Sequence, residues 1–188
     1  MSSVLVELAV AVGAFVGTMI DNYFAFAGQL AISAPERHRG LAWAQATGVA
    51  GLVVVAATLA YALTNVPLRA VGLLALAPWL LGLHAWRHRD DTTAEPRRRG
   101  QVTTFLTTFA LGGDNLAVWA PLLRAAAPAR AALSIVAFAV CEVGFVVSAR
   151  TLAGHPRVVA WGQRQGRRLV PLVYGLLGVA ILLECHTL

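Results

Sequence analysis

Long apolar runs separated by short polar segments dominate the hydrophobicity pattern of this chain. A helix of about 20 apolar residues crosses the hydrocarbon core of a bilayer, and one of about seventeen can just do so. Six runs meet this condition and are expected to be transmembrane helices. They lie at roughly Val4–Ser33, Leu41–Leu63, Ala70–Trp86, Val102–Leu123, Ala131–Ala149 and Leu169–Cys185.

The composition supports an all-α integral membrane fold. Of the 188 residues, 58% are hydrophobic and 13% are charged, a balance that excludes an ordinary water-soluble domain. The first run is too long for a cleaved signal peptide, and Asp21 interrupts it. The loops are short, and residues 87–100 form the one longer linker. We therefore expect a single membrane domain over residues 1–188.

The distribution of arginine predicts the orientation in the membrane. All fifteen basic residues are Arg; the first, third and fifth loops hold twelve of them and the opposite side holds three. Because cytoplasmic loops are enriched in basic residues, these loops should be cytoplasmic and both termini outside. An anionic-lipid or partner site is the alternative interpretation of these loops. The net charge of +6 thus reflects a protein of the cell membrane, with no nucleic-acid partner expected.

Two Asp-Asn pairs, Asp21-Asn22 and Asp114-Asn115, lie within apolar runs. An ionised carboxylate at the bilayer centre costs about 3 kcal/mol on insertion scales, so its presence indicates a function. The aspartates are 93 residues apart, and each lies in the first helix of a three-helix set. An odd number of crossings per half predicts two inverted repeats, at about residues 4–90 and 101–188.

The polar residues around the aspartates suggest a cation site. Small residues follow the face of the first helix that carries Asp21, and such a face usually packs against other helices. In the fourth run Gly112 and Gly113 should weaken the helix just before Asp114. No basic residue lies at mid-membrane depth to neutralise the acids, which favours a cationic substrate. Oxygen donors suit a divalent ion. The candidate ligands are Asp21, Asp114, Asn22, Asn115, Thr18, Gln45 and Glu142.

Other interpretations remain open for several of these residues. Two protonated aspartates could simply hydrogen-bond between helices, and Gln45 could make a helix–helix hydrogen bond. The tail from Glu184 to His186 is either a ligand cluster or a frayed end. The histidines fall at helix ends or in loops, with no Ser-His pairing or His-Glu-x-x-His helix, so we expect neither an enzyme nor a cofactor. Cys141 and Cys185 show no metal-site spacing.

Five motifs follow one another along nearly the whole chain: Phe15–Asn22, Gln45–Gly48, Leu76–Gly82, Gly112–Asn115 with Pro121, and Tyr174–Gly178 leading to Glu184. In order and spacing they resemble the CadD-type cadmium resistance transporter family of the LysE superfamily. The resemblance implies a membrane exporter of divalent metal ions in which Asp21 and Asp114 match the two intramembrane aspartates of the family. Where the family pattern has Asp-Asp, this chain has Asp21-Asn22.

The sequence therefore predicts a secondary transporter that exports a divalent cation such as cadmium, zinc or manganese from the cytoplasm. The cation is expected to exchange with protons. The alternative is an exporter of a cationic amino acid or another small organic solute, for which the same acids would bind an amine. A homodimer is left open.

Overall fold

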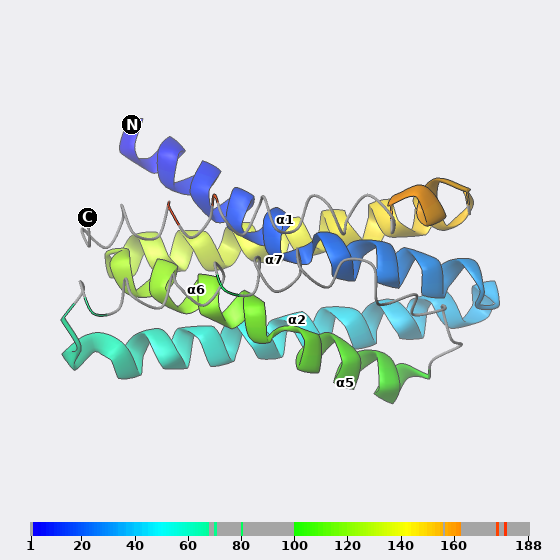
Figure 1. Ribbon diagram of the computed structural model, residues 1–188, viewed down its shortest axis with the longest axis horizontal. Coiled ribbons are helices and arrows are strands. Elements are labelled where there is room, and N and C mark those ends of the chain that lie inside the picture. Colours follow the sequence, from blue (N-terminus) through cyan, green and yellow to red (C-terminus); the bar gives the residue numbers. More distant parts are fainter. Residues whose placement is uncertain are drawn as a thin grey trace.

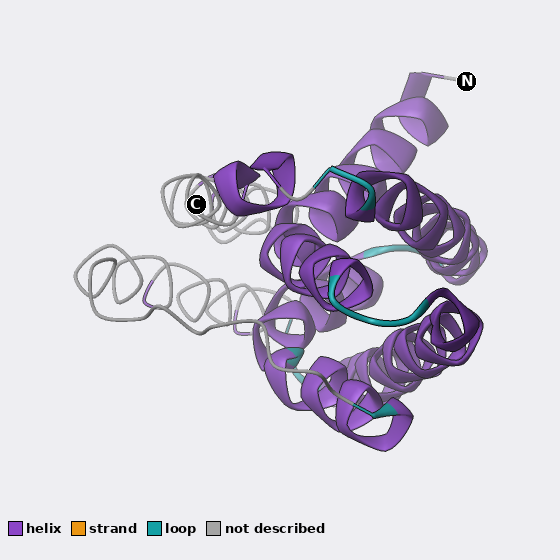
Figure 2. Cartoon of the chain, turned by 90° about the vertical axis from the view of Figure 1, so that its right-hand side faces the viewer, coloured by secondary structure: helices purple, strands orange, loops and turns teal. Residues whose placement is uncertain are grey.

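The computed structural model describes residues 2–67, 70, 80, 100–155, 157–162, 176 and 179. Within these ranges the regular structure is helical (Figure 2). The predicted third and sixth helices and the linker at 87–99 lie, apart from single residues, outside the described part. The elements are α1 (Ser2–Ala31), α2 (Pro35–Ala62), the 3-10 turn η1 (Leu63–Asn65), α5 (Gln101–Leu111), α6 (Gly113–Ala125) and α7 (Pro128–Ala153).

Three described segments are long and apolar enough to cross a membrane: Val4–Ala31, Pro35–Asn65 and Pro128–Ala153. They correspond to the predicted first, second and fifth runs. The all-helical membrane character of the described chain agrees with the sequence pattern. The count of six crossings and the inverted repeat stay predictions.

Two helices begin earlier than the hydrophobic pattern predicts, each at a proline. The polar segment 35–40 is not the expected turn, because α2 already begins at Pro35, with Glu36 in its first turn. Likewise α7 begins at Pro128 rather than at Ala131. Proline suits the first helical position because its fixed φ is helical and its missing N–H would have no partner in the helix. An acidic side chain in the first turn also complements the helix dipole.

The predicted fourth helix is divided at Gly112, where the glycine pair predicts a weak point. Its halves are α5 with 11 residues and α6 with 13, and neither is long enough to span the bilayer alone. Gly112 has an ordinary φ of −83°. Its small size matters instead, because a Cβ there would lie 2.9 Å from Leu52 Cγ and still closer to the two methyl groups of Leu52. The glycine thus lets α2 approach the break closely.

The helix α1 packs mainly on α7, although the two are far apart in sequence (Figure 1). Near their beginnings Arg130 Nη1 lies 3.3 Å from Glu7 Oε2. Further along both helices, the rings of Tyr23 and Phe145 meet edge to face with centroids 5.2 Å apart. Because the contacts advance in the same direction along both chains, α1 and α7 run parallel.

The second parallel pair is α2 against α5 and α6. The Thr108 hydroxyl donates a hydrogen bond of 2.6 Å to Gln45 Oε1 in the interior. At the far end of the pair, Arg124 Nε donates to the Leu63 carbonyl oxygen at 2.9 Å. A cation at the C-terminal end of a helix satisfies carbonyls that have no partner within it. By contrast, the consecutive helices α1 and α2 touch only slightly.

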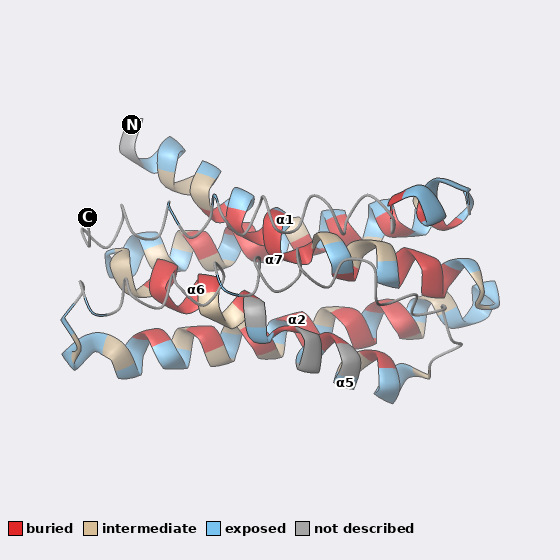
Figure 3. Cartoon of the chain, in the orientation of Figure 1, coloured by how far each residue is buried: buried red, intermediate tan, exposed pale blue. Residues whose placement is uncertain are grey.

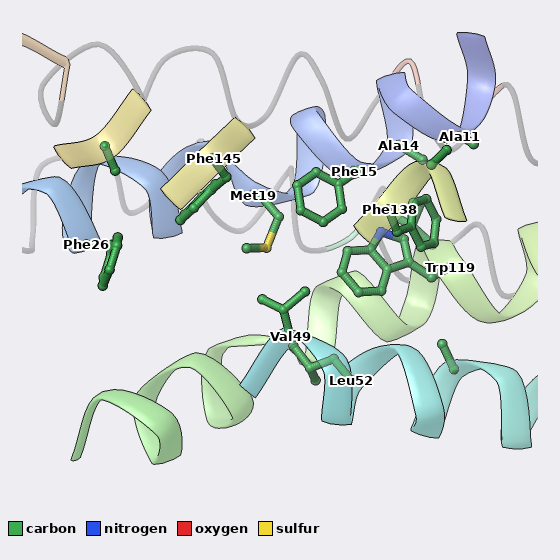
Figure 4. Packing of buried hydrophobic residues seen from close by; sticks show 14 of the residues in the cluster. Ala11, Ala14, Phe15, Met19, Phe26, Val49, Leu52, Trp119, Phe138 and Phe145 are labelled. Atoms are coloured by element: carbon green, nitrogen blue, oxygen red, sulfur yellow. The ribbon is translucent and has the colours of Figure 1, made fainter. Parts of the chain in front are cut away.

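An aromatic cluster joins α1, α6 and α7 in the middle of the bundle. Phe15 stacks on Trp119 with ring centroids 5.7 Å apart, and Trp119 lies 4.9 Å from Phe138 (Figure 4). Buried residues lie on α1, α2, α5, α6 and α7 alike (Figure 3). Inside a bilayer such close packing, rather than escape from water, holds helices together.

The contact of Gly112 with Leu52 gives a first prediction. We expect Gly112→Ala to destabilise the protein by about 1–3 kcal/mol, because the added methyl group overpacks a buried contact. The measurement is the thermal unfolding of purified protein in detergent. The matched control is Gly113→Ala, one residue on, where a Cβ would meet nothing within 4 Å. In a Leu52→Ala background the Gly112→Ala penalty should shrink, and an unchanged penalty would contradict the prediction.

Candidate cation site

The asparagines of the two Asp-Asn pairs meet at one sulfur atom in the interior. Asn22 Nδ2 lies 3.8 Å from Met19 Sδ, and Asn115 Nδ2 lies 3.4 Å from the same sulfur. The exposed fractions are 6% for Asn22, 1% for Met19 and 0% for Asn115. The structure thus brings together α1 and α6 through these three residues, hereafter the Asn-Met cluster.

Helix geometry explains how α1 contributes two members of the cluster. Its buried face advances by steps of three and four residues, which is the spacing of neighbours along one side of a helix. This face passes through Phe15, Met19, Asn22 and Phe26. Figure 4 shows the Met19 side chain pointing from α1 into the space between α1 and α2. The Asn22 amide and the Met19 thioether are therefore held within a stripe whose other members are aromatic.

The third member, Asn115, owes its place to the helix break. It follows Gly112 by three residues, in the first turn of α6. The backbone N–H of Leu116 donates to the Gly112 carbonyl at 3.1 Å, so α6 starts directly at the break. The close packing of Leu52 on Gly112 brings this turn into the core.

Asp21 does not lie on the buried face. It is exposed, and its Oδ1 accepts a hydrogen bond of 2.8 Å from the backbone N–H of Asn22. The expectation that the small-residue face through Asp21 packs inward is therefore wrong at Asp21 and at Ala25, which is exposed as well. Adjacent helical residues point about 100° apart, so burial of Asn22 turns Asp21 outward.

Asp114 lies in the first turn of α6, one residue before the buried Asn115. Its side chain is outside what the structure describes. A site shared by the two carboxylates therefore stays a prediction, whereas the meeting of the two neighbouring amides is observed.

Thr18 and Gln45 are both buried and hydrogen-bonded. The Thr18 hydroxyl donates to the Ala14 carbonyl oxygen at 2.9 Å, within its own helix. Gln45 takes part in the interhelical hydrogen bond with Thr108, which is the alternative that the sequence left open. Its Nε2 has no hydrogen-bond partner among the described residues. A role for either residue as a ligand stays a prediction.

Glu142 lies in a separate cavity between α7 and the first half of α2. The cavity has a volume of about 430 Å³, and its lining includes Arg39, Trp43, Glu142 and Arg150. Glu142 is 6% exposed, and neither carboxylate oxygen has a hydrogen-bond partner within the described chain. The described contacts do not connect it to the Asn-Met cluster.

The chemistry of the site differs from that of a preformed metal centre. Among the described residues, no group of three or more His, Cys, Asp or Glu could hold a metal ion together. None of the buried residues in the described part is basic. The donors available in the interior are amides, hydroxyls and a thioether, with Asp21 and Asp114 next to them in sequence. Sequence reasoning missed Met19, although it lies three residues before Asn22 within one motif.

Comparison with known proteins identifies the family. The family model described as cadmium resistance transporter matches residues 15–188, a range that contains the Asn-Met cluster and both Asp-Asn pairs. A search of curated proteins and a search of solved structures both return no match. The family match confirms the resemblance inferred from the motifs, and the apolar helices fit a membrane protein. The chain therefore belongs to the cadmium resistance transporter family.

Proposed function

We propose that this protein is a secondary transporter that exports divalent heavy-metal cations, such as cadmium, zinc or manganese, from the cytoplasm in exchange for protons. The observation that carries the proposal is the meeting of Asn22 and Asn115, one from each Asp-Asn pair, at the buried sulfur of Met19. The membership of the chain in the cadmium resistance transporter family supports metal transport. The exchange for protons, the direction of transport and the range of transported ions are our proposal.

The local electrostatics favour a cation as the transported species. Amide oxygens and a thioether sulfur are electron-pair donors, and no basic residue is buried among the described residues. Each buried asparagine is next to an aspartate. In the proposed cycle, Asp21 and Asp114 supply the negative charge and Asn22 and Asn115 the neutral oxygen donors. Thr18 and Gln45 are further candidate donors, whereas Glu142 lies in a separate cavity.

Exchange would require a change in conformation, because Asp21 is exposed in the described state while Asn22 is buried. Because Asp21 and Asn22 point about 100° apart, α1 would have to rearrange substantially for the Asp21 carboxylate to reach the cluster. Protons and metal ions compete for carboxylates, so protonation from outside would release the metal and complete the cycle.

Two contacts related by a shift of 93 residues support the proposed inverted repeat. Phe15 contacts Phe138 with ring centroids 5.9 Å apart, and Thr108 hydrogen-bonds Gln45. Adding 93 to position 15 gives 108, and adding it to 45 gives 138. The same shift relates Asp21 to Asp114. The shift thus converts the contact between α1 and α7 into the contact between α5 and α2. Such matching contacts are expected when the two halves of a chain are structural repeats around a central site.

A second candidate function is export of a cationic amino acid or another small organic solute. The cavity at Glu142 favours it, because a buried carboxylate without a described partner could bind an ammonium group. Arg39 and Arg150, which also line this cavity, could bind a carboxylate of the same molecule.

The leading proposal predicts the effect of neutralising either aspartate. Asp21→Asn and Asp114→Asn should each abolish cadmium tolerance in cells while the protein remains in the membrane, because each removes a charge that binds the cation. The measurement is growth at graded cadmium concentrations together with immunoblotting of membranes. Glu7→Gln is the matched control on α1, since Glu7 contacts Arg130 away from the cluster. Retained tolerance in either aspartate variant would refute the proposal.

The proposed orientation places the C-terminus outside. Alkaline phosphatase fused after Leu188 should be active, because it folds only when exported, whereas a green fluorescent protein fused at the same position should be dark. The reverse pair of results would show that the predicted orientation is inverted.

Binding of substrates to the purified protein separates the two candidate functions. Calorimetric titration should show that cadmium binds. In Glu142→Gln the dissociation constant for cadmium should stay within about threefold of the wild-type value, since Glu142 lies in a separate cavity. Binding of lysine without any divalent cation, lost in Glu142→Gln, would instead support the organic solute.

A further inference from the structure

We infer that the thioether of Met19 is a metal ligand that makes the site selective for soft divalent cations over hard ones. This inference rests on the proposed function, because it concerns the same site. It adds a residue that the charge pattern of the sequence does not indicate, and it narrows the class of substrate.

The position of the sulfur is the first argument. Met19 Sδ lies 3.4 Å from the Asn115 amide nitrogen and 3.8 Å from that of Asn22, so it is a point at which α1 and α6 meet. A ligand held by both asparagines would occupy the space next to this sulfur. Met19 is also two residues before Asp21, within one turn of the same helix.

The second argument is the chemistry of the three side chains. In the described state each amide directs its N–H group at the sulfur, which is a weak acceptor. Rotation of an Asn side chain by half a turn about its last torsion replaces the nitrogen with the amide oxygen. Two such rotations would surround a cation with two oxygens and one sulfur, without any movement of the backbone.

The third argument concerns which cations such a donor set prefers. Thioether sulfur is a soft ligand, whereas Mg²⁺, Ca²⁺ and Mn²⁺ prefer carboxylate, carbonyl and water oxygens. At this position a hard ion would exchange a water oxygen for a sulfur that binds it poorly. A soft ion such as Cd²⁺ would gain a favourable sulfur ligand. The proximity of the sulfur therefore disfavours the hard ions that are abundant in cells.

Methionine also fills irregular gaps in cores, so the test must separate ligation from packing. The composition makes this feasible, because the chain contains two methionines and Met19 is the one that follows Met1. Selenomethionine incorporation thus places a single internal selenium atom at the cluster. A side chain that only fills space would not bond to the metal.

The experiment is selenium X-ray absorption on selenomethionine-labelled protein in detergent, with and without one equivalent of Cd²⁺. We expect a selenium–cadmium scattering shell that is absent without metal and absent in labelled Met19→Leu, which reports any contribution of Met1. If Cd²⁺ binds to the wild-type protein in a parallel titration but no such shell forms, the inference is wrong and the proposed function stands. If no divalent ion binds at all, both fail.

Selectivity provides a second readout. Met19→Leu keeps a similar volume, so the fold should persist, as thermal unfolding would show. We expect the dissociation constant for Cd²⁺ to rise about tenfold and that for Mn²⁺ to change by less than about threefold, since sulfur contributes to binding of the soft ion alone. Equal changes for both ions, or no change for Cd²⁺, would overturn the inference.

Discussion

A helix inside a bilayer can be interrupted only where protein, not lipid, covers the backbone groups that lose their helical partners. In this protein the interruption at Gly112 is covered by Leu52 of α2, and the absence of a side chain at Gly112 makes that contact close. The start of α6 consequently lies in the core. Asn115 is buried there beside Met19, and the remaining features of the candidate site follow from this packing.

The bundle is held mainly by contacts between elements that are distant in sequence. The helix α1 pairs with α7, and α2 pairs with the broken helix α5–α6, each in parallel. This arrangement places polar groups from the two halves of the chain at a common centre. The Asn-Met cluster lies at the contact between the two pairs, because Met19 and Asn22 belong to α1 and Asn115 belongs to α6.

Several features of the fold follow from local sequence. Apolar runs longer than a bilayer crossing predict helices because backbone groups in lipid must be satisfied internally, and the glycine pair before Asp114 predicts the weak point that became the break. The helix starts at Pro35 and Pro128 were missed, because a hydrophobicity pattern does not register a polar first turn stabilised by proline. The burial of Asn22 rather than Asp21 was missed too, because the sequence does not show which of two adjacent polar residues faces the interior.

The sequence by itself determined the membrane class, the family and the two Asp-Asn pairs, because length, apolarity and motif spacing are local properties of the chain. Only the tertiary structure decided which side of α1 faces inward, that Gln45 reaches Thr108, and that two asparagines share the sulfur of Met19. The physical reason is that a helix with apolar residues all round has no preferred inner face until it packs. The neighbours with which it packs then select which of its few polar groups are buried.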